Sequence, residues 1–174
     1  MQQLVVCAIG QNEPKLLKTL SKAIIDCGGS ITDSRMTILG NEFTLMMLLS
    51  GSWDAIVKIE ALLPRLQDQL ALTFVTRRTE SVEKTAHLIP YMVEVVALYH
   101  PEIIYEITRF FTHHNIHMEE MVSNYYTTAK TGTPMFSLTL TIHVPATASI
   151  ATLRGEFMDL CDELNLDSVM GPVK

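Results

Sequence analysis

The chain has 174 residues, of which 48% are hydrophobic, and its formal net charge is −6. This charge opposes binding to the phosphate backbone of a nucleic acid, and no apolar run approaches the roughly 18 residues that a membrane-spanning helix needs. Because the first residues enter a predicted strand without a basic leader, we expect a soluble, cytoplasmic protein that binds neither DNA directly nor a membrane.

A strand and an amphipathic helix are the first predicted elements. Residues 4–9 are an apolar run of strand length, and residues 14–31 carry apolar side chains at the spacing of one helix face. Pro14 suits the first turn of that helix, where its missing N–H would have had no partner. Gly28 suits the left-handed conformation that closes a helix. The pattern therefore predicts a helix that begins at the proline and ends at the glycine.

Three further elements follow this helix. Residues 30–39 are predicted to be extended, and a tight turn at Gly40 leads to residues 41–50, which alternate like a strand with one buried face. Apolar side chains at helical spacing then predict a second helix, and residues 72–76 form the last predicted strand. The apolar positions of the second helix are Ile56, Ile59, Leu63 and Leu66.

The same order of elements returns after a polar segment at residues 78–90. Pro101 repeats Pro14 at an offset of 87, and Asn115 repeats Gly28. Like glycine, asparagine adopts the left-handed conformation that ends a helix at a low energetic cost. The chain is therefore predicted to be a duplication, with domains at residues 1–77 and 91–174 and a linker at 78–90. The predicted elements of the second copy are a strand at 92–98, a helix from Pro101, an extended segment at 117–127, a strand at 134–144, a helix through Ile150, Leu153, Phe157 and Leu160, and a strand at 166–170.

Each copy has the order βαββαβ. This order is the split βαβ arrangement of ferredoxin-like domains, in which two helices cover one face of a four-stranded antiparallel sheet. We therefore predict an α+β protein made of two tandem ferredoxin-like domains.

The two copies differ on the sheet face that the helices leave open. In the second copy, Ser137, Thr139 and Thr141 give the strand at 134–144 a polar outer face, as expected of a sheet that is covered on one side only. In the first copy, the corresponding outer positions include Met46 and Leu48. Large apolar patches are uncommon on soluble monomers, so we expect an interface here, formed with the other repeat, a second copy of the chain or another protein.

Histidines and adjacent acids do not predict a catalytic or metal site. His113 and His117 have i, i+4 spacing, but the predicted helix ends near Asn115, so the two imidazoles should not share a metal ion. Glu119 and Glu120 are adjacent in a predicted extended segment and should point to opposite faces, whereas an acid and base pair must converge.

Neither the cysteines nor the glycines form a motif that indicates an enzyme. Cys7, Cys27 and Cys161 lack the spacing of a metal knuckle or a redox dithiol, and we predict that they are small buried hydrophobic residues. The chain also lacks a nucleophile elbow, a P-loop and a dinucleotide-binding glycine motif. We therefore expect no enzyme activity, no cofactor and no metal.

The loop between the first strand and the first helix is the candidate ligand site. A helix N-terminus offers unpaired N–H groups and a partial positive charge, which together suit a carboxylate. Gly10 could let a ligand approach the backbone, and Asn12 and Glu13 could accept hydrogen bonds from an ammonium group. The alternative is that Asn12 only caps the helix at Pro14 and that Glu13 is solvated. The second copy has Tyr99 and His100 in the same place.

In each copy, the motifs at the two ends of the first predicted helix resemble those of ACT domains, which are small amino-acid-sensing modules. The family pattern places Asp-x-Pro-Gly before the helix and Gly-x-Asn-Ile after it. Here residues 12–15 read Asn-Glu-Pro-Lys and residues 28–31 read Gly-Gly-Ser-Ile, so the first motif lacks the aspartate and the last glycine. The resemblance implies an amino-acid site at Gly10, Asn12, Glu13 and Pro14, completed by Ser30 or Ile31 of a neighbouring subunit, and hence a homo-oligomer.

A narrower resemblance covers nearly the whole chain. Residues 39–53 (LGNEFTLMMLLSGSW), residues 33–35 (DSR) and residues 160–165 (LCDELN) are similar to those of the tandem ACT-domain regulators of the glycine cleavage system. This resemblance implies a negative regulator that binds a DNA-binding activator of the glycine cleavage operon, with glycine as the signal. The alternative is a stand-alone amino-acid sensor that modulates a metabolic enzyme.

Overall fold

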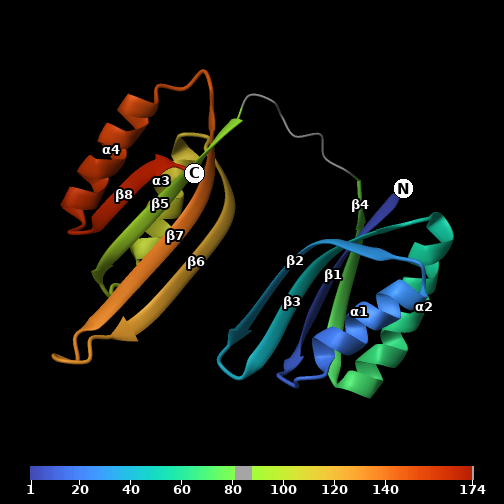
Figure 1. Cartoon of the computed structure of the whole chain (residues 1–174). Coiled ribbons are helices and arrows are strands. Elements are labelled where there is room, and N and C mark those ends of the chain that lie inside the picture. Colours follow the sequence, from blue (N-terminus) through green and yellow to red (C-terminus); the bar gives the residue numbers. More distant parts are fainter. Residues whose placement is uncertain (81–87, 174) are drawn as a thin grey trace. The chain divides into compact units, whose positions relative to one another are not determined.

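A computed structural model describes residues 1–80 and 88–173 of the chain. The chain divides into two compact units, Met1–Glu83 and Lys84–Lys174. Figure 1 shows that each contains one sheet and two helices, which confirms the predicted duplication and the α+β fold class.

The first unit has the order βαββαβ, and its sheet has the strand order β2-β3-β1-β4 with every pairing antiparallel. In Figure 1 both helices lie on the same side of this sheet. The elements are β1 (Gln2–Gln11), α1 (Leu16–Asp26), β2 (Ser30–Leu39), β3 (Glu42–Gly51), α2 (Trp53–Leu70) and β4 (Leu72–Thr79).

The core of the first unit lies between its sheet and its two helices. Alternate residues of β3, including Phe43, Leu45 and Met47, are buried beneath the helices, as the period of two predicts. Side chains at helical spacing on α1 and α2, such as Leu20 and Ile59, form the other half of this core. Burial of each such side chain stabilises the unit by roughly 1.5 to 3 kcal/mol before the entropy cost of ordering the chain.

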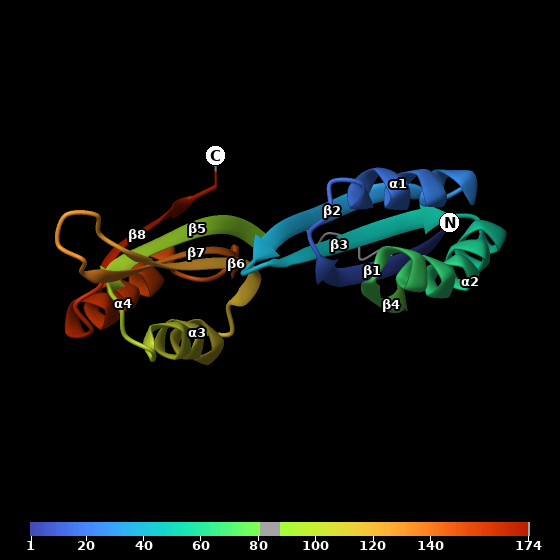
Figure 2. The same cartoon turned by 90° about the horizontal axis from the view of Figure 1, so that it is seen from below.

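The second unit repeats this architecture, with the strand order β6-β7-β5-β8. Figure 2 shows α3 and α4 on the same side of its sheet. Its core contains aromatic side chains, because Phe111 and Phe157 are fully buried with ring centroids 5.1 Å apart. The elements are β5 (Leu88–Leu98), α3 (Ile103–His113), β6 (His117–Thr127), β7 (Pro134–Pro145), α4 (Ile150–Glu163) and β8 (Asp167–Pro172).

The predicted helix ends are confirmed, and the predicted helix starts are wrong by two residues. Gly28 and Asn115 have φ values of 83° and 53°, the left-handed conformation expected after each helix. Pro14 and Pro101 both lie in a turn before the helix. In the first unit this turn is closed by the Leu16 N–H, which donates to the Glu13 carbonyl at 3.1 Å.

The predicted linker at 78–90 overlaps strands at both of its ends. Strand β4 continues to Thr79, where the Arg78 guanidinium makes two hydrogen bonds to Glu60 at 2.6 and 2.9 Å, and β5 begins at Leu88. Residues 81–87 lie outside the described part of the chain. The limits of the two domains therefore stay a prediction. Among the described helices, none is long and apolar enough to cross a membrane.

Candidate functional site

The predicted ligand loop joins β1 to α1 and is open to solvent. Asn12, Glu13 and Pro14 are all exposed in this loop. The residue that precedes α1 as its N-cap is Lys15, and no side chain caps the helix there. The alternative interpretation of Asn12 as a helix cap is therefore wrong, because the helix begins too late for Asn12 to reach its first amides.

The start of α1 has the electrostatic character that a carboxylate needs. Its first turn contains no acidic residue, and Lys15 and Lys18 lie beside the first amides of the helix. Within the described residues, no backbone carbonyl and no side chain accepts a hydrogen bond from the N–H of Leu17 or Lys18. The positive end of the helix dipole, the free amides and the two ammonium groups all favour an anion at this point. The two lysines were not predicted, although they directly follow the loop in the sequence.

The equivalent loop of the second unit has a different character. Glu102 is the N-cap residue of α3, Glu106 lies in the first helical turn, and the Glu102 N–H is within 3.4 Å of the His100 Nδ1 atom. Two acidic side chains at a helix N-terminus repel a carboxylate ligand. Tyr99 packs edge-to-face on Tyr125, with ring centroids 5.0 Å apart. These features make the loop of the first unit the better match for a carboxylate of the two.

Gly10 packs closely against the connection between α2 and β4. A Cβ atom at this position would lie 2.6 Å from the Ala71 carbonyl oxygen and 2.8 Å from the Leu72 Cδ2 atom. The space beside Gly10 is therefore filled by the connection between α2 and β4. Ala71 has a φ of 51°, so this connection turns sharply against β1. The absence of a side chain at Gly10 permits this close packing, and its role in ligand approach stays a prediction.

Ser30 and Ile31 lie at the opposite end of the first sheet from the loop. Both β1 and β2 pair antiparallel with β3, and Gly10 lies opposite Phe43 whereas Ser30 lies opposite Ser50. Positions 43 and 50 are seven residues apart along β3, a distance of about 23 Å for a strand. The Ser30 Oγ atom donates to the Ser50 carbonyl at 3.2 Å. One unit by itself therefore does not bring the two parts of the predicted site together.

The histidines at the end of α3 do not share one helix face. His113 is the last residue of α3, and His117 is the first residue of β6. His117 stacks on His143 with ring centroids 6.2 Å apart, and the His143 Nε2 atom lies 3.3 Å from a Glu119 carboxylate oxygen. Within residues 1–80 and 88–173, no group of three or more histidine, cysteine or acidic side chains could hold a metal ion.

His114 connects the two helices of the second unit. Its Nδ1 atom lies 2.9 Å from the Phe110 carbonyl oxygen, and its Nε2 atom lies 2.6 Å from the Glu156 carboxylate. The hydrogen bond to the Phe110 carbonyl raises the pKa of His114, and the Glu156 carboxylate adds to this effect against the opposing effect of burial. The protonated imidazole can donate to both groups at once, so this contact ties α3 to α4.

The three cysteines are in different environments. Cys161 is fully buried in α4, and burial raises the pKa of its thiol. Cys27 and Cys7 are only partly buried. Cys7 lies on β1 opposite Met46, on the side of the sheet that the helices leave open. The prediction of a buried residue is confirmed for Cys161 and is wrong for Cys7, because Cys7 alternates with the buried residues of β1.

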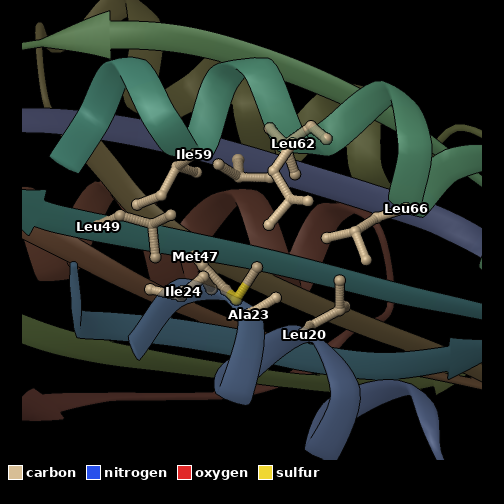
Figure 3. A pocket seen from close by; sticks show the side chains of 10 residues that line it. Leu20, Ala23, Ile24, Met47, Leu49, Ile59, Leu62 and Leu66 are labelled. Atoms are coloured by element: carbon tan, nitrogen blue, oxygen red, sulfur yellow. The ribbon is translucent and has the colours of Figure 1, made fainter. Parts of the chain in front are cut away.

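A small cavity in the first unit lies between its helices and its sheet (Figure 3). Its volume is about 10 Å³, and every lining residue is apolar. Such a space is at the lower limit for one water molecule and offers that water no polar partner. Ala23 of α1 borders the gap, whereas Phe110 at the equivalent position of α3 packs on Phe157 at 5.4 Å. The cavity is thus a packing difference between the units. It has no room for a ligand.

The family comparisons agree with this fold. Residues 2–77 match the family of ACT domains. The chain is 35% identical over 162 residues to the glycine cleavage system transcriptional repressor of Escherichia coli strain K12, covering 93% of this chain and 85% of that protein. The repressor of the same description from Shigella flexneri matches with the same identity and coverage.

Two solved structures match the whole chain. A crystal structure provisionally described as a glycine cleavage system transcriptional repressor is 28% identical, with a TM-score of 0.74, covering 99% of this chain and 98% of that one. A protein of unknown function from Galdieria sulphuraria has a TM-score of 0.79 at 18% identity, with 99% of both chains covered. The second match concerns the fold alone, and it extends the shared architecture to both units.

Proposed function

This chain belongs to the family of the glycine cleavage system transcriptional repressor. We propose that it opposes a DNA-binding activator of a glycine cleavage operon by binding that activator. The observation that carries this proposal is the similarity to the Escherichia coli repressor over 93% of the chain. The proposed place of action is the cytoplasm, and the proposal includes no catalytic step.

The charge of the chain supports action through a protein contact. Residues 88–173 contain ten acidic side chains and three basic ones, whereas residues 1–80 contain eight of each. A unit with this acidic excess is repelled by DNA phosphates, so the chain gains little from direct contact with the promoter. A DNA-binding activator, in contrast, must present basic side chains to bind DNA, and it is therefore a suitable partner for an acidic regulator.

We further propose that glycine binds at the loop between β1 and α1 of the first unit. Its carboxylate would accept hydrogen bonds from the free amides of Leu17 and Lys18, and its ammonium group would donate to Asn12 or Glu13. The site would be completed by Ser30 or Ile31 of another copy, because one unit holds these residues about 23 Å from the loop. Self-association is therefore part of this proposal.

A binding experiment with the activator tests the regulatory role. The purified activator of the glycine cleavage operon from the same organism is immobilised, and this chain is titrated onto it with and without glycine. We expect saturable binding that glycine weakens, because an operon for glycine breakdown is needed when glycine is present. Absence of binding under both conditions would contradict the proposal. Recovery of a metabolic enzyme instead would favour the alternative of an amino-acid sensor for that enzyme.

A further inference from the structure

The sheet of the first unit has an apolar face that the unit's own helices do not cover. We call it the open face. Met46 is 53% exposed, Ile9 is 47% exposed and Val75 is 65% exposed. Contiguous exposed apolar surface of this kind marks an interaction site in most soluble proteins. The apolar residues of the open face are Val5, Cys7, Ile9, Met46, Leu48 and Val75.

The strand register places a charge at each end of one row across the open face. Asp33 of β2 lies opposite Leu48 of β3, Leu48 lies opposite Val5 of β1, and Val5 lies opposite Arg77 of β4. The row therefore reads acid, apolar, apolar, base. The two charges lie at opposite edges of the sheet, three strand spacings or about 14 Å apart, so they do not pair with each other within one unit.

We propose that a second copy of this chain covers the open face, through a two-fold axis that runs along the strands between β1 and β3. Rotation about this axis places the row of one copy against the same row of the other copy in reverse order. Leu48 of each copy then meets Val5 of the other, and Asp33 of each copy meets Arg77 of the other. Two-fold interfaces must be self-complementary in this sense, and two sheets pack face to face with their strands nearly aligned.

The charges on the open face favour a second copy over other occupants. Asp33 and Glu42 balance Arg35 and Arg77, so the face has no net charge. Asp33 also forms an ion pair with Arg35, at 2.5 Å. An anionic surface such as DNA or a lipid membrane would gain nothing from a face without net charge. In a second copy the row from Asp33 to Arg77 meets its own reverse, and in the next row Arg35 lies beside Val75 of the other copy while it keeps its ion pair with Asp33.

The open side of the second sheet lacks this complementarity. Its strands place Glu94, Glu120 and Asp167 on the side away from the helices, and no lysine or arginine lies on that side among the described strand residues. Two copies of this surface would bring charges of one sign together, which is destabilising. We therefore assign self-association to the first unit alone.

The size of the open face is sufficient for a stable contact. Four strands about 4.8 Å apart, read over about eight residues of about 3.3 Å each, present roughly 500 Å². Two such faces contribute roughly 1,000 Å², which is the size that a specific protein interface needs. This dimer is separate from the self-association proposed above for the glycine site, because an axis along the strands leaves Ser30 of either copy about 23 Å from both loops. The dimer does not depend on contact with the activator, so the dimer proposal and the proposed regulatory role can be tested separately.

The mass of the purified protein in solution tests the proposal. The parent should have twice the monomer mass of 19.5 kDa by light scattering after gel filtration. Met46→Asp buries two new charges in the apolar part of the interface and should raise the dimer dissociation constant by more than about 100-fold, giving a monomer. The matched control is Met92→Asp on the open side of the second sheet, where the parent residue is 38% exposed and the dimer should persist. Far-ultraviolet circular dichroism checks that both variants fold.

A charge exchange tests the axis itself. Arg77→Asp alone and Asp33→Arg alone each place like charges together twice, and each should weaken the dimer about tenfold or more. When the two variants are mixed, each contact pairs an acid with a base, so dimers of one variant with the other should form again. If mixing restores no dimer, the proposed axis is wrong.

Labelling of Cys7 gives an independent readout. In a Cys27→Ser background, Cys161 is buried and Cys7 is the remaining partly exposed thiol. A maleimide should label Cys7 slowly in the parent dimer and rapidly after Met46→Asp. A monomeric parent would overturn the proposal whether Cys7 is protected or not. A dimer that Met92→Asp dissociates, or in which Cys7 reacts as fast as after Met46→Asp, would also overturn it.

Discussion

His114 and Glu156 join the two helices of the second unit by a 2.6 Å contact between the imidazole Nε2 atom and the carboxylate. The raised pKa of His114 means that the folded state holds its proton more tightly than the unfolded state does. The stabilisation from this contact is fully present below the unfolded pKa of His, about 6.5. It is lost as the pH rises through the higher folded pKa.

We therefore expect the parent to lose more stability between pH 6 and pH 8 than His114→Gln does. The difference should be below about 1 kcal/mol, since the Glu156 side chain is 52% exposed and solvent screens the pair. Urea unfolding of both proteins across this pH range measures it. Glu156→Gln should reduce the pH dependence in part, because the Phe110 carbonyl remains as an acceptor. Equal pH dependence of the parent and His114→Gln would contradict this account of the contact.

Gly10→Ala should destabilise the first unit. The added Cβ would meet the Ala71 carbonyl oxygen at 2.6 Å, so β1 or the connection between α2 and β4 must move. Overpacking of this kind costs about 1 to 3 kcal/mol. The matched control is Gly171→Ala in β8, where a Cβ would meet no atom within 4 Å and the change should be small. Thermal unfolding of the three proteins makes the comparison, and an unchanged melting temperature for Gly10→Ala would contradict it.

Gly155→Ala should stabilise the second unit. Gly155 lies inside α4, and an added Cβ would meet no atom within 4 Å. Alanine is favoured over glycine inside a helix by about 1 kcal/mol, because it loses less backbone entropy on folding. Denaturant unfolding monitored by circular dichroism should show a higher midpoint at an unchanged slope. A lower midpoint would mean that the glycine has a structural role in α4.

Asn12→Ala separates a ligand role from a stability role. No side chain caps α1, so this substitution should change the free energy of unfolding by less than about 0.5 kcal/mol. It should nevertheless weaken glycine binding, measured by calorimetric titration. Ser52→Ala is the matched control, since the Ser52 side chain caps α2 by accepting from the Ala55 N–H and its loss should cost about 1 kcal/mol. Unchanged glycine binding after Asn12→Ala would remove Asn12 from the proposed site.

The fold could be predicted because each copy repeats the same local signals. Gly28 and Asn115 follow the first helix of each copy, and both have the left-handed backbone conformation, which costs their residue types little energy. The strand residues 30–39 and 117–127 agree with β2 and β6 to the residue. Pro14 was misplaced because proline fits the turn before a helix as well as its first turn, and the sequence does not distinguish these two positions.

The candidate site could be predicted only in part, because its residues depend on contacts between distant segments. Gly10 follows the pattern of a ligand-binding glycine, but its neighbours are Ala71 and Leu72, which lie far along the sequence. The place of Ser30 relative to the loop follows from the sheet order, which no local motif encodes. The row from Asp33 to Arg77 likewise needs the register of four strands before it can be recognised.

A gel-mobility shift on the glycine cleavage promoter tests the central claim most directly. The chain alone should leave the promoter at its free mobility even at low salt, where electrostatic binding is strongest. When the activator is present, the chain should change the mobility or the amount of the activator–DNA complex, and glycine should reverse that change. A specific, salt-sensitive shift by this chain alone, or an activator–DNA complex that the chain leaves unchanged, would contradict the account.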